Sequence, residues 1–196
     1  PLPSEQNKRA TLEIINLLEK SDERDLVIML ISGGGSALLC MPDDMTCEDE
    51  VTLTHLLSQK GATINELNTV RKHVSRVKGG NLARYSYPAQ VVSLIFSDVP
   101  GNDVSVIASG PTVLDSSTCE DAEAVLNKYG LGGTVSLRET PKKPRYFERV
   151  RNIVVLENTA ALSGMEQRAK ELGLFPVICT DCMGGEARTA AQVMLG

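Results

Sequence analysis

Apolar residues recur at helical spacing in the first part of the chain. Leu12, Ile15 and Leu18 lie three residues apart with polar residues between them, which places them on one face of a helix. Ser4 comes before this pattern and is a suitable N-cap. We therefore predict a helix over residues 5–20. Further helices are predicted over residues 47–60, 64–77, 120–128 and 159–172, and a last one opens over 186–194.

Short apolar runs lie between the predicted helices. Residues 26–31 (LVIMLI) and 91–96 (VVSLIF) are the longest, and such runs are typical of buried central strands in parallel sheets. Two more strands are predicted over 152–156 and 175–179. Helices and strands in alternation predict an α/β sheet with both faces covered. Residues 131–149 hold two prolines and several basic residues, and are predicted to form a linker or excursion.

The composition is that of an ordinary globular domain. The chain has 196 residues, of which 42% are hydrophobic and 23% are charged, and this length can bury a real core. A net charge of -5 and a pI of about 5.1 argue against broad nucleic-acid binding and against a polybasic membrane anchor. No apolar run reaches the roughly 18 residues of a membrane span. Nucleic acids and membranes are therefore not expected as partners.

The cysteines and histidines give no strong signal for a metal or redox site. Five cysteines are an odd number spread along the chain, which argues against a disulfide framework and favours a reducing compartment, cytoplasmic or mitochondrial. Cys179 and Cys182 have CxxC spacing, but we interpret this single pair as incidental thiols at a strand end. His55 and His73 lack an obvious carboxylate or cysteine constellation, and we interpret both as ordinary histidines.

A glycine-rich loop follows the first predicted strand, and it consists of Ser32, Gly33, Gly34, Gly35 and Ser36. Three glycines in a row cost backbone entropy, which is expected where the chain turns sharply or approaches a ligand closely. The N–H groups at the start of the next helix suit an anion. The loop is not a P-loop, and Leu38 replaces the third glycine of a dinucleotide fingerprint. We predict an anion-binding loop; a ligand-free tight turn is the alternative.

A second loop with candidate chemistry follows the predicted strand over 91–96. Asp98 comes directly after this strand, where a carboxylate can hold Mg²⁺ or accept a proton, and Asp103 is a second candidate. Small and hydroxyl-bearing residues, Ser109, Gly110 and Thr112, provide another ligand edge. The alternative is a turn in which the two aspartates cap their own loop.

Polar residues on the predicted helix between these loops form the third candidate group. Asn65, Asn68 and Lys72 recur at i, i+3 and i+7 and share a helix face. Arg71 lies beside that face and suits a carboxylate or a phosphate, and Lys78 is a further cation before two glycines. A solvated polar face is the alternative. Since ligands of open α/β sheets bind at the carboxyl ends of the strands, we predict that Gly34 and Asp98 face one cleft.

Three segments of the chain resemble the signature blocks of the class II glycerate kinase (MOFRL) family. They are ISGGGSALL (31–39), GATINELNTVRKHVSRVKGGNLA (61–83) and SDVPGNDVSVIASGPTVLD (97–115), and they occur in the family's order and spacing. The opening PLPSEQNKRAT resembles the stretch that precedes the family's glycine-rich loop. Together these segments span nearly the whole chain, so their joint match is far more specific than a single glycine motif.

The resemblance implies a fold and an activity. The fold is a three-layer αβα, Rossmann-like domain with a mostly parallel sheet and helices on both faces, followed by a smaller C-terminal MOFRL domain. The activity is ATP-dependent phosphorylation of D-glycerate with Mg²⁺, and 2-phosphoglycerate is the favoured product. Residues 1–196 then form a partial larger domain, without the family's upstream lysine and without the C-terminal domain, and a homodimer is an expected assembly.

The resemblance also suggests roles for the candidate residues. The glycine-rich loop would hold either the ATP phosphates or the glycerate carboxylate, and Arg71 and Lys72 would neutralise charge. Asp98 and Asp103 would position the metal ion or the acceptor hydroxyl, while Asn102 stands where a second acidic residue is expected. Two alternatives stay open: a nucleotide-binding oxidoreductase, and a truncated ligand-binding domain without catalysis.

Overall fold

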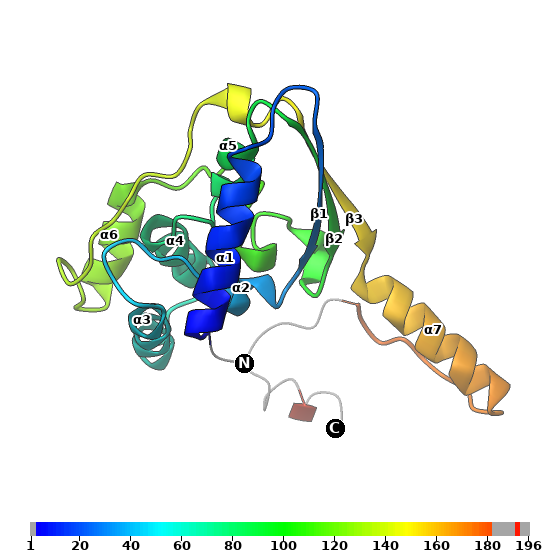
Figure 1. Cartoon of the computed structure of the whole chain (residues 1–196). Helices are drawn as coiled ribbons and strands as arrows, with labels where there is room; N and C mark the ends of the chain where they lie inside the picture. Colours follow the sequence, from blue (N-terminus) through cyan, green and yellow to red (C-terminus); the bar gives the residue numbers. More distant parts are fainter. Residues whose placement is uncertain (1–2, 182–190, 193–196) are drawn as a thin grey trace.

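A three-stranded parallel sheet organises the structure (Figure 1). The computed structural model describes residues 3–181 and 191–192. Strands β1 (Leu26–Ser32), β2 (Gln90–Phe96) and β3 (Val150–Leu156) lie side by side in chain order, and both pairs are parallel. Parallel neighbours require long crossovers, which here carry most of the helices. The predicted α/β class with a parallel sheet is confirmed.

Three of the helices begin directly after a threonine whose side chain caps the first turn. Thr46, Thr63 and Thr118 each accept the backbone N–H three residues further on, which satisfies a donor that the helix itself leaves unpaired. The helices before β2 are α1 (Glu5–Leu18), α2 (Gly35–Leu38), α3 (Cys47–Gln59), α4 (Ile64–Val74) and α5 (Asn81–Ser86). The later ones are η1 (Pro100–Asn102), η2 (Ile107–Ser109), α6 (Cys119–Lys128), η3 (Pro144–Tyr146) and α7 (Asn158–Glu171).

Within the described residues, one face of the sheet is covered and the other is exposed. Helices α1 to α6 lie on one side of the sheet (Figure 1), where Val91 and Ile95 of β2 are buried. On the opposite face Leu26, Ile28 and Leu30 are 56%, 61% and 74% exposed. The prediction that residues 26–31 form a strand buried on both faces is therefore wrong for this part of the chain. A second helical layer is not seen in it and stays a prediction.

The predicted helix over residues 64–77 ends three residues early, at Val74. Ser75 is extended, with φ -112° and ψ 140°, and forms an isolated antiparallel bridge with Pro42. Arg76 N–H donates to the Met41 carbonyl at 2.8 Å. These contacts hold the chain in an extended form, so Val77 reaches the core from outside the helix.

Two other predictions fail or change. Residues 175–179 form no strand, since Phe175 and Val177 are 99% and 81% exposed and no described strand lies beside them to complete a ladder. The segment 131–149 is not a free linker, because Leu131 and Leu137 pack against the core cluster around Leu126. The predicted helix over 186–194 lies largely outside the described residues.

The cysteine prediction also needs a correction. Cys40 and Cys47 form a disulfide across a sequence separation of seven, because the turn before α3 returns the chain to the end of the glycine-rich segment. Two of the five cysteines therefore form a disulfide, and the odd number of cysteines is no longer an argument for a reducing compartment. None of the helices among the described residues has both the length and the apolar character of a membrane span.

Candidate active site

The glycine-rich loop and Asp98 meet at the carboxyl edge of the sheet. The last residues of β1 and β2 are register partners, Ser32 with Phe96, so the loops that follow them are neighbours. A Cβ on Gly33 would lie 1.9 Å from Asp98 Oδ2, which means that the carboxylate fills the space of the missing side chain. The prediction that the carboxyl ends of the two strands lie side by side is confirmed, and a cleft shared by Gly34 and Asp98 stays a prediction.

The loop also packs against a backbone segment of unusual conformation. A Cβ on Gly35 would lie 2.9 Å from the Ala108 Cβ. Ala108 and Ser109 have left-handed φ values of 52° and 60°, and Gly110 follows with 60°. Such conformations cost non-glycine residues on the order of 1–3 kcal/mol each, and they concentrate at functional sites.

Hydrogen bonds from α4 and the turn after it fix this segment. Gly79 N–H donates to the Ser109 carbonyl at 2.9 Å, and Ser109 Oγ donates to Asn68 Oδ1 at 2.9 Å. Asn68 Nδ2 is buried and has no hydrogen-bond partner in the described part of the chain, so it is a free donor beside the strained segment. Asn65, by contrast, is exposed, so it does not share the buried position of Asn68 although both lie on α4.

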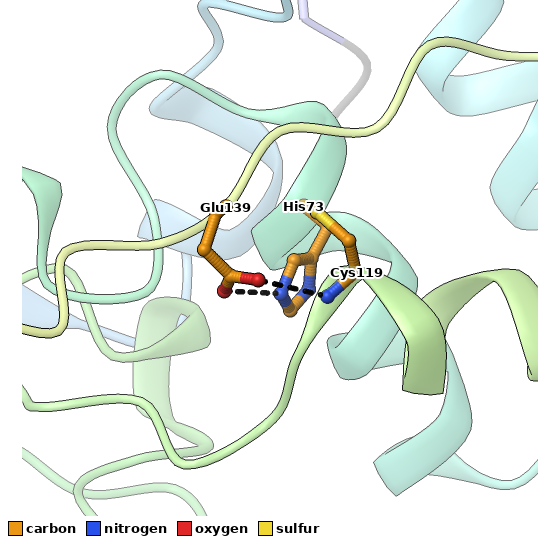
Figure 2. A group of neighbouring side chains, drawn as sticks. All are labelled: His73, Cys119 and Glu139. Atoms are coloured by element: carbon orange, nitrogen blue, oxygen red, sulfur yellow. Dashed lines mark hydrogen bonds and ion pairs between the residues drawn. The ribbon is translucent and has the colours of Figure 1, made fainter.

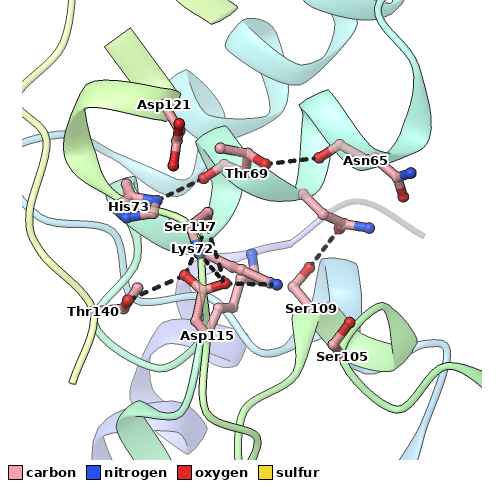
Figure 3. Close-up of polar contacts among 12 residues, drawn as sticks. Asn65, Thr69, Lys72, His73, Ser105, Ser109, Asp115, Ser117, Asp121 and Thr140 are labelled. Carbon is pink, nitrogen blue, oxygen red and sulfur yellow. Dashed lines mark hydrogen bonds and ion pairs between the residues drawn. The ribbon is translucent and has the colours of Figure 1, made fainter. Parts of the chain in front are cut away.

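Lys72 is held by a protein carboxylate. Its Nζ lies 3.0 Å from Asp115 Oδ1, and the two side chains are 11% and 2% exposed (Figure 3). Ser117 and Thr140 hydroxyls also donate to Asp115. Burial raises the pKa of Asp115, but Lys72 and the Ser117 hydrogen bond outweigh it and lower that pKa overall. Lys72 therefore has a fixed partner inside the fold.

Lys78 forms a second buried ion pair. Its Nζ contacts Glu50 Oε1, and the Lys78 and Glu50 side chains are 1% and 7% exposed. Burial lowers the pKa of Lys78, and the charge of Glu50 opposes that change. Sequence reasoning missed Glu50, because it is one of three acidic residues in the first turn of α3 and looks like an ordinary helix-terminal charge.

Arg71 lines a cavity of about 290 Å³ next to the end of the glycine-rich loop. Its Nε donates to Thr54 Oγ1 at 3.3 Å, and Ser36 and Glu50 line the same cavity. Burial lowers the pKa of Arg71, and Glu50 opposes this; a guanidinium stays charged in either case. Arg71 thus presents a positive group to a small, partly polar space.

A larger and mainly apolar cavity lies on the other side of the loop. It has a volume of about 490 Å³ and lies between α1 and β1, and its lining includes Ser32, Gly34 and Gly35. The glycine-rich loop therefore separates an apolar cavity from the smaller cavity that Arg71 lines. The larger volume is within the range of small-molecule sites, and the smaller one is at its lower limit.

Thr112 belongs to the interior of the sheet. Its Oγ1 accepts a hydrogen bond from Ser93 at 3.1 Å and donates to Asn152 Oδ1 at 2.7 Å, and the residue is 1% exposed. These bonds tie the loop to β2 and β3. The structure therefore gives Thr112 partners within the protein, and Thr112 lines neither of the two cavities.

Asp103 and Asn102, which lie near Asp98, both have hydrogen-bond partners within the protein. Asp103 Oδ1 accepts the Ser105 N–H at 2.9 Å, so this carboxylate caps its own loop. Asn102 Nδ2 donates to Glu157, the first residue after β3. Glu157 thus supplies a carboxylate next to the position where an acidic residue was expected. The strand-end rule that indicated Asp98 would have indicated Glu157 too.

Comparison with known families and proteins identifies the chain's relatives. Residues 1–140 match a family model described as "Domain of unknown function (DUF4147)". The chain belongs to the DUF4147 family. Its match covers α1 to α6 and all the candidate residues except Glu157.

Relatives of this DUF4147 chain carry kinase names. A "Glycerate kinase" from Macaca fascicularis is 46% identical over 201 residues, which is 97% of this chain and 51% of the relative. A "D-glycerate 2-kinase" from Thermotoga maritima is 39% identical over 195 residues, 98% of this chain and 47% of the relative. A crystal structure of a Thermotoga maritima glycerate kinase superposes with a TM-score of 0.78 at 41% identity, covering 88% of this chain and 42% of that one.

One relative has a name from another enzyme class. A protein from Agrobacterium vitis, 44% identical over the whole of this DUF4147 chain and 46% of its own length, is named "Putative hydroxypyruvate reductase". The chain thus spans about half the length, or less, of the relatives it matches.

Proposed function

We propose that the protein is an ATP-dependent kinase that phosphorylates D-glycerate, with 2-phosphoglycerate as the product. One observation supports this most: the Asp98 carboxylate packs against Gly33 at the carboxyl edge of the sheet, and Ser36 of the same glycine-rich loop lines a cavity that also holds the Arg71 guanidinium. Phosphoryl transfer depends on such positioned charges more than on covalent chemistry. The name of the Thermotoga maritima relative favours the 2-position.

ATP would bind along the glycine-rich loop. The apolar cavity beside Gly34 and Gly35 suits the base and ribose, and its volume of about 490 Å³ is sufficient for them. The phosphates would then lie over the loop, where glycines allow close approach and the hydroxyls of Ser32 and Ser36 can donate. Helix α2 has only four residues, so its dipole is short and the loop donors matter more.

D-Glycerate would bind in the smaller cavity. Arg71 offers its carboxylate a bidentate partner, and a volume of about 290 Å³ suits a three-carbon acid. Ser36 lines this cavity while Gly35 lines the other, so the two substrates would meet at the end of the loop. Asn68 Nδ2, the free donor beside Ser109, is an additional candidate for a ligand contact.

We propose that Mg²⁺ is held by the acidic residues at the ends of β2 and β3. Asp98 and Glu157 follow neighbouring strands, and Asn102, bonded to Glu157, offers an amide oxygen. Carboxylate and amide oxygens are the ligands of hard divalent cations. When bound, the ion would neutralise phosphate charge. Because Asp103 caps its own loop, we assign the second carboxylate to Glu157 instead.

Lys72 and Lys78 would act as positioning residues. Each is paired with a carboxylate, Asp115 or Glu50, in the interior. Lys72 lies one turn after Asn68 on α4, and Lys78 precedes Gly79, which bonds Ser109. Their ion pairs would keep α4 and the strained segment in register, while Arg71 supplies the charge that meets substrate.

The domain arrangement and the assembly also remain proposals. We propose that residues 1–196 are part of the larger domain of a two-domain enzyme, with the remainder of the cleft supplied by the smaller MOFRL domain. The partial coverage of the relatives supports this. A homodimer and a cytoplasmic or mitochondrial location stay predictions.

An assay of the full-length protein distinguishes the kinase from the reductase that one relative's name suggests. Release of ADP that depends on D-glycerate is expected, without oxidation of NADH or NADPH in the presence of hydroxypyruvate. The absence of a complete dinucleotide fingerprint at Leu38 supports this expectation. Oxidation of a nicotinamide cofactor without ADP release would replace the kinase proposal with the reductase.

Replacing Arg71 with alanine in the full-length protein is expected to raise the KM for D-glycerate about tenfold to a hundredfold, since a charge-assisted contact is worth about 1.5–3 kcal/mol. The KM for ATP and the melting temperature should change little. Steady-state kinetics with each substrate varied in turn measure this, and Arg24→Ala, an exposed and remote arginine, is the control. A steep fall in melting temperature with unchanged kinetics would make Arg71 structural.

A further inference from the structure

Three potential metal ligands from separate segments meet outside the candidate active site (Figure 2). His73 lies in the last turn of α4, Cys119 is the first residue of α6, and Glu139 precedes η3. One ligand atom from each lies within 4.8 Å of the other two. Among the described residues this is the one such group of histidine, cysteine and acidic side chains.

The buried histidine has one nitrogen without a hydrogen bond. His73 is 0% exposed, and its Nδ1 lies 2.8 Å from the Thr69 carbonyl oxygen. A carbonyl only accepts, so Nδ1 must carry the proton, and the neutral ring then has a lone pair on Nε2. Within the described residues Nε2 makes no hydrogen bond, and Glu139 Oε1 lies 3.4 Å away. A lone pair facing a carboxylate oxygen is repulsive unless a cation, either a proton or a metal ion, lies between them.

Backbone donors orient the carboxylate toward the histidine. Glu139 Oε2 accepts the Cys119 N–H at 3.1 Å, and Oε1 accepts the Thr140 N–H at 3.1 Å. Ligating carboxylates are usually held by outer hydrogen bonds of this kind. Lys142 Nζ also approaches Oε1, at 3.2 Å, but it has further partners in the Asp115 carbonyl and Thr140 hydroxyl that it can keep.

We propose that His73 Nε2, Cys119 Sγ and the Glu139 carboxylate form a site for a divalent cation of the zinc class. Imidazole, thiolate and carboxylate together are a donor set that Zn²⁺ accepts, with water as the fourth ligand. Tetrahedral zinc holds its ligands roughly 3.3–3.8 Å apart at its usual bond lengths. Closing the group from within 4.8 Å requires rotation of Glu139, whose side chain is 45% exposed.

The bound ion would join three segments that carry part of the candidate active site. It would tie the end of α4 to the start of α6 and to the segment that holds Thr140 and Lys142. These two residues also bond Asp115, the partner of Lys72. The site is therefore a structural one that stabilises the wall behind Lys72, and it takes no direct part in phosphoryl transfer.

Metal titration of the 196-residue chain tests the site. A background variant with Cys179→Ser and Cys182→Ser removes the CxxC thiols as competing ligands for zinc. In this background, calorimetry with Zn²⁺ should give one equivalent per chain, and Co²⁺ should give a thiolate-to-cobalt charge-transfer band. Cys119→Ser should abolish the band. Loss of a residue that only hydrogen-bonds to a metal ligand weakens metal binding about 10–100-fold, so loss of the ligand in Glu139→Gln should weaken zinc binding by at least that much. The control Glu148→Gln changes an exposed residue and should leave zinc binding unchanged.

Two results would overturn the proposal. One is the absence of stoichiometric zinc binding to the background variant, which would mean that a proton alone lies between His73 and Glu139. The other is a cobalt thiolate band, or a zinc affinity, that survives both Cys119→Ser and Glu139→Gln. Melting temperatures of each variant with and without Zn²⁺ show that the variants are folded, so that lost binding is not mistaken for lost structure.

Discussion

Replacing Glu50 with alanine is expected to lower the free energy of unfolding of the chain by about 3–5 kcal/mol, the usual cost of leaving one member of a buried ion pair without its partner. Glu50 pairs with Lys78, and both side chains are almost fully buried. Without the carboxylate, the Lys78 ammonium has no nearby counter-charge among the described residues, and the adjacent Arg71 repels it. Chemical denaturation measures the loss, and Glu48→Ala, an exposed residue of the same helix turn, is the matched control.

The same variant has a predictable dependence on pH. Burial lowers the pKa of Lys78 in the folded chain, so between that lowered pKa and the ordinary lysine value of about 10.4 the unfolded chain binds more protons. The free energy of unfolding therefore rises with pH in this window. Loss of Glu50 lowers the pKa further and steepens the rise, to at most about 1.4 kcal/mol per pH unit. A loss as small as that of Glu48→Ala, without a steeper slope, would contradict a buried charged pair.

Replacing Asp98 with alanine in the full-length protein is expected to reduce kcat/KM for D-glycerate by about 10²–10⁴-fold, the range found when a positioned acid or base is removed. Asp98 is exposed, so the melting temperature should hardly change. The reason is its position against Gly33, where it can orient the metal ion or the acceptor hydroxyl.

Asp103→Ala is the control for this prediction, because Asp103 is also exposed and lies in the same loop, but it caps its own backbone. It should lower kcat/KM only a few-fold. Equal losses in both variants, or a loss in neither, would exclude the role assigned to Asp98.

The strand ends of the site could be predicted from the sequence, because they depend on local rules. The apolar runs in the sequence predicted β1 and β2. Because the loops that follow parallel strands lie at one edge of the sheet, Gly33 and Asp98 could be expected to be neighbours. The same rule applied to β3 would have found Glu157. The helix predicted over residues 64–77 also corresponds to α4, whose Leu67 and Val70 belong to the core.

The burial of the cations could not be predicted in the same way. Lys72 and Lys78 look like solvated charges in the sequence, since their partners Asp115 and Glu50 are 43 and 28 residues away. Helix α4 packs against α6 through its apolar side and against the segment holding Asp115 through a polar side. The periodicity of apolar residues predicts the burial of the apolar side only. The exposure of Ile28 on the open sheet face has the same origin, since an apolar run does not reveal which segments cover it.

The central claim is that residues 1–196 supply one half of a two-domain glycerate kinase site. Release of ADP in the presence of D-glycerate, measured side by side on the 196-residue chain and on the full-length protein, tests it most directly. The full-length protein should turn over, and the chain should be at least about a thousandfold slower, because donor, acceptor and cations must be held together in a closed site. No D-glycerate-dependent ADP release by the full-length protein, or turnover by the chain within about tenfold of it, would contradict the claim.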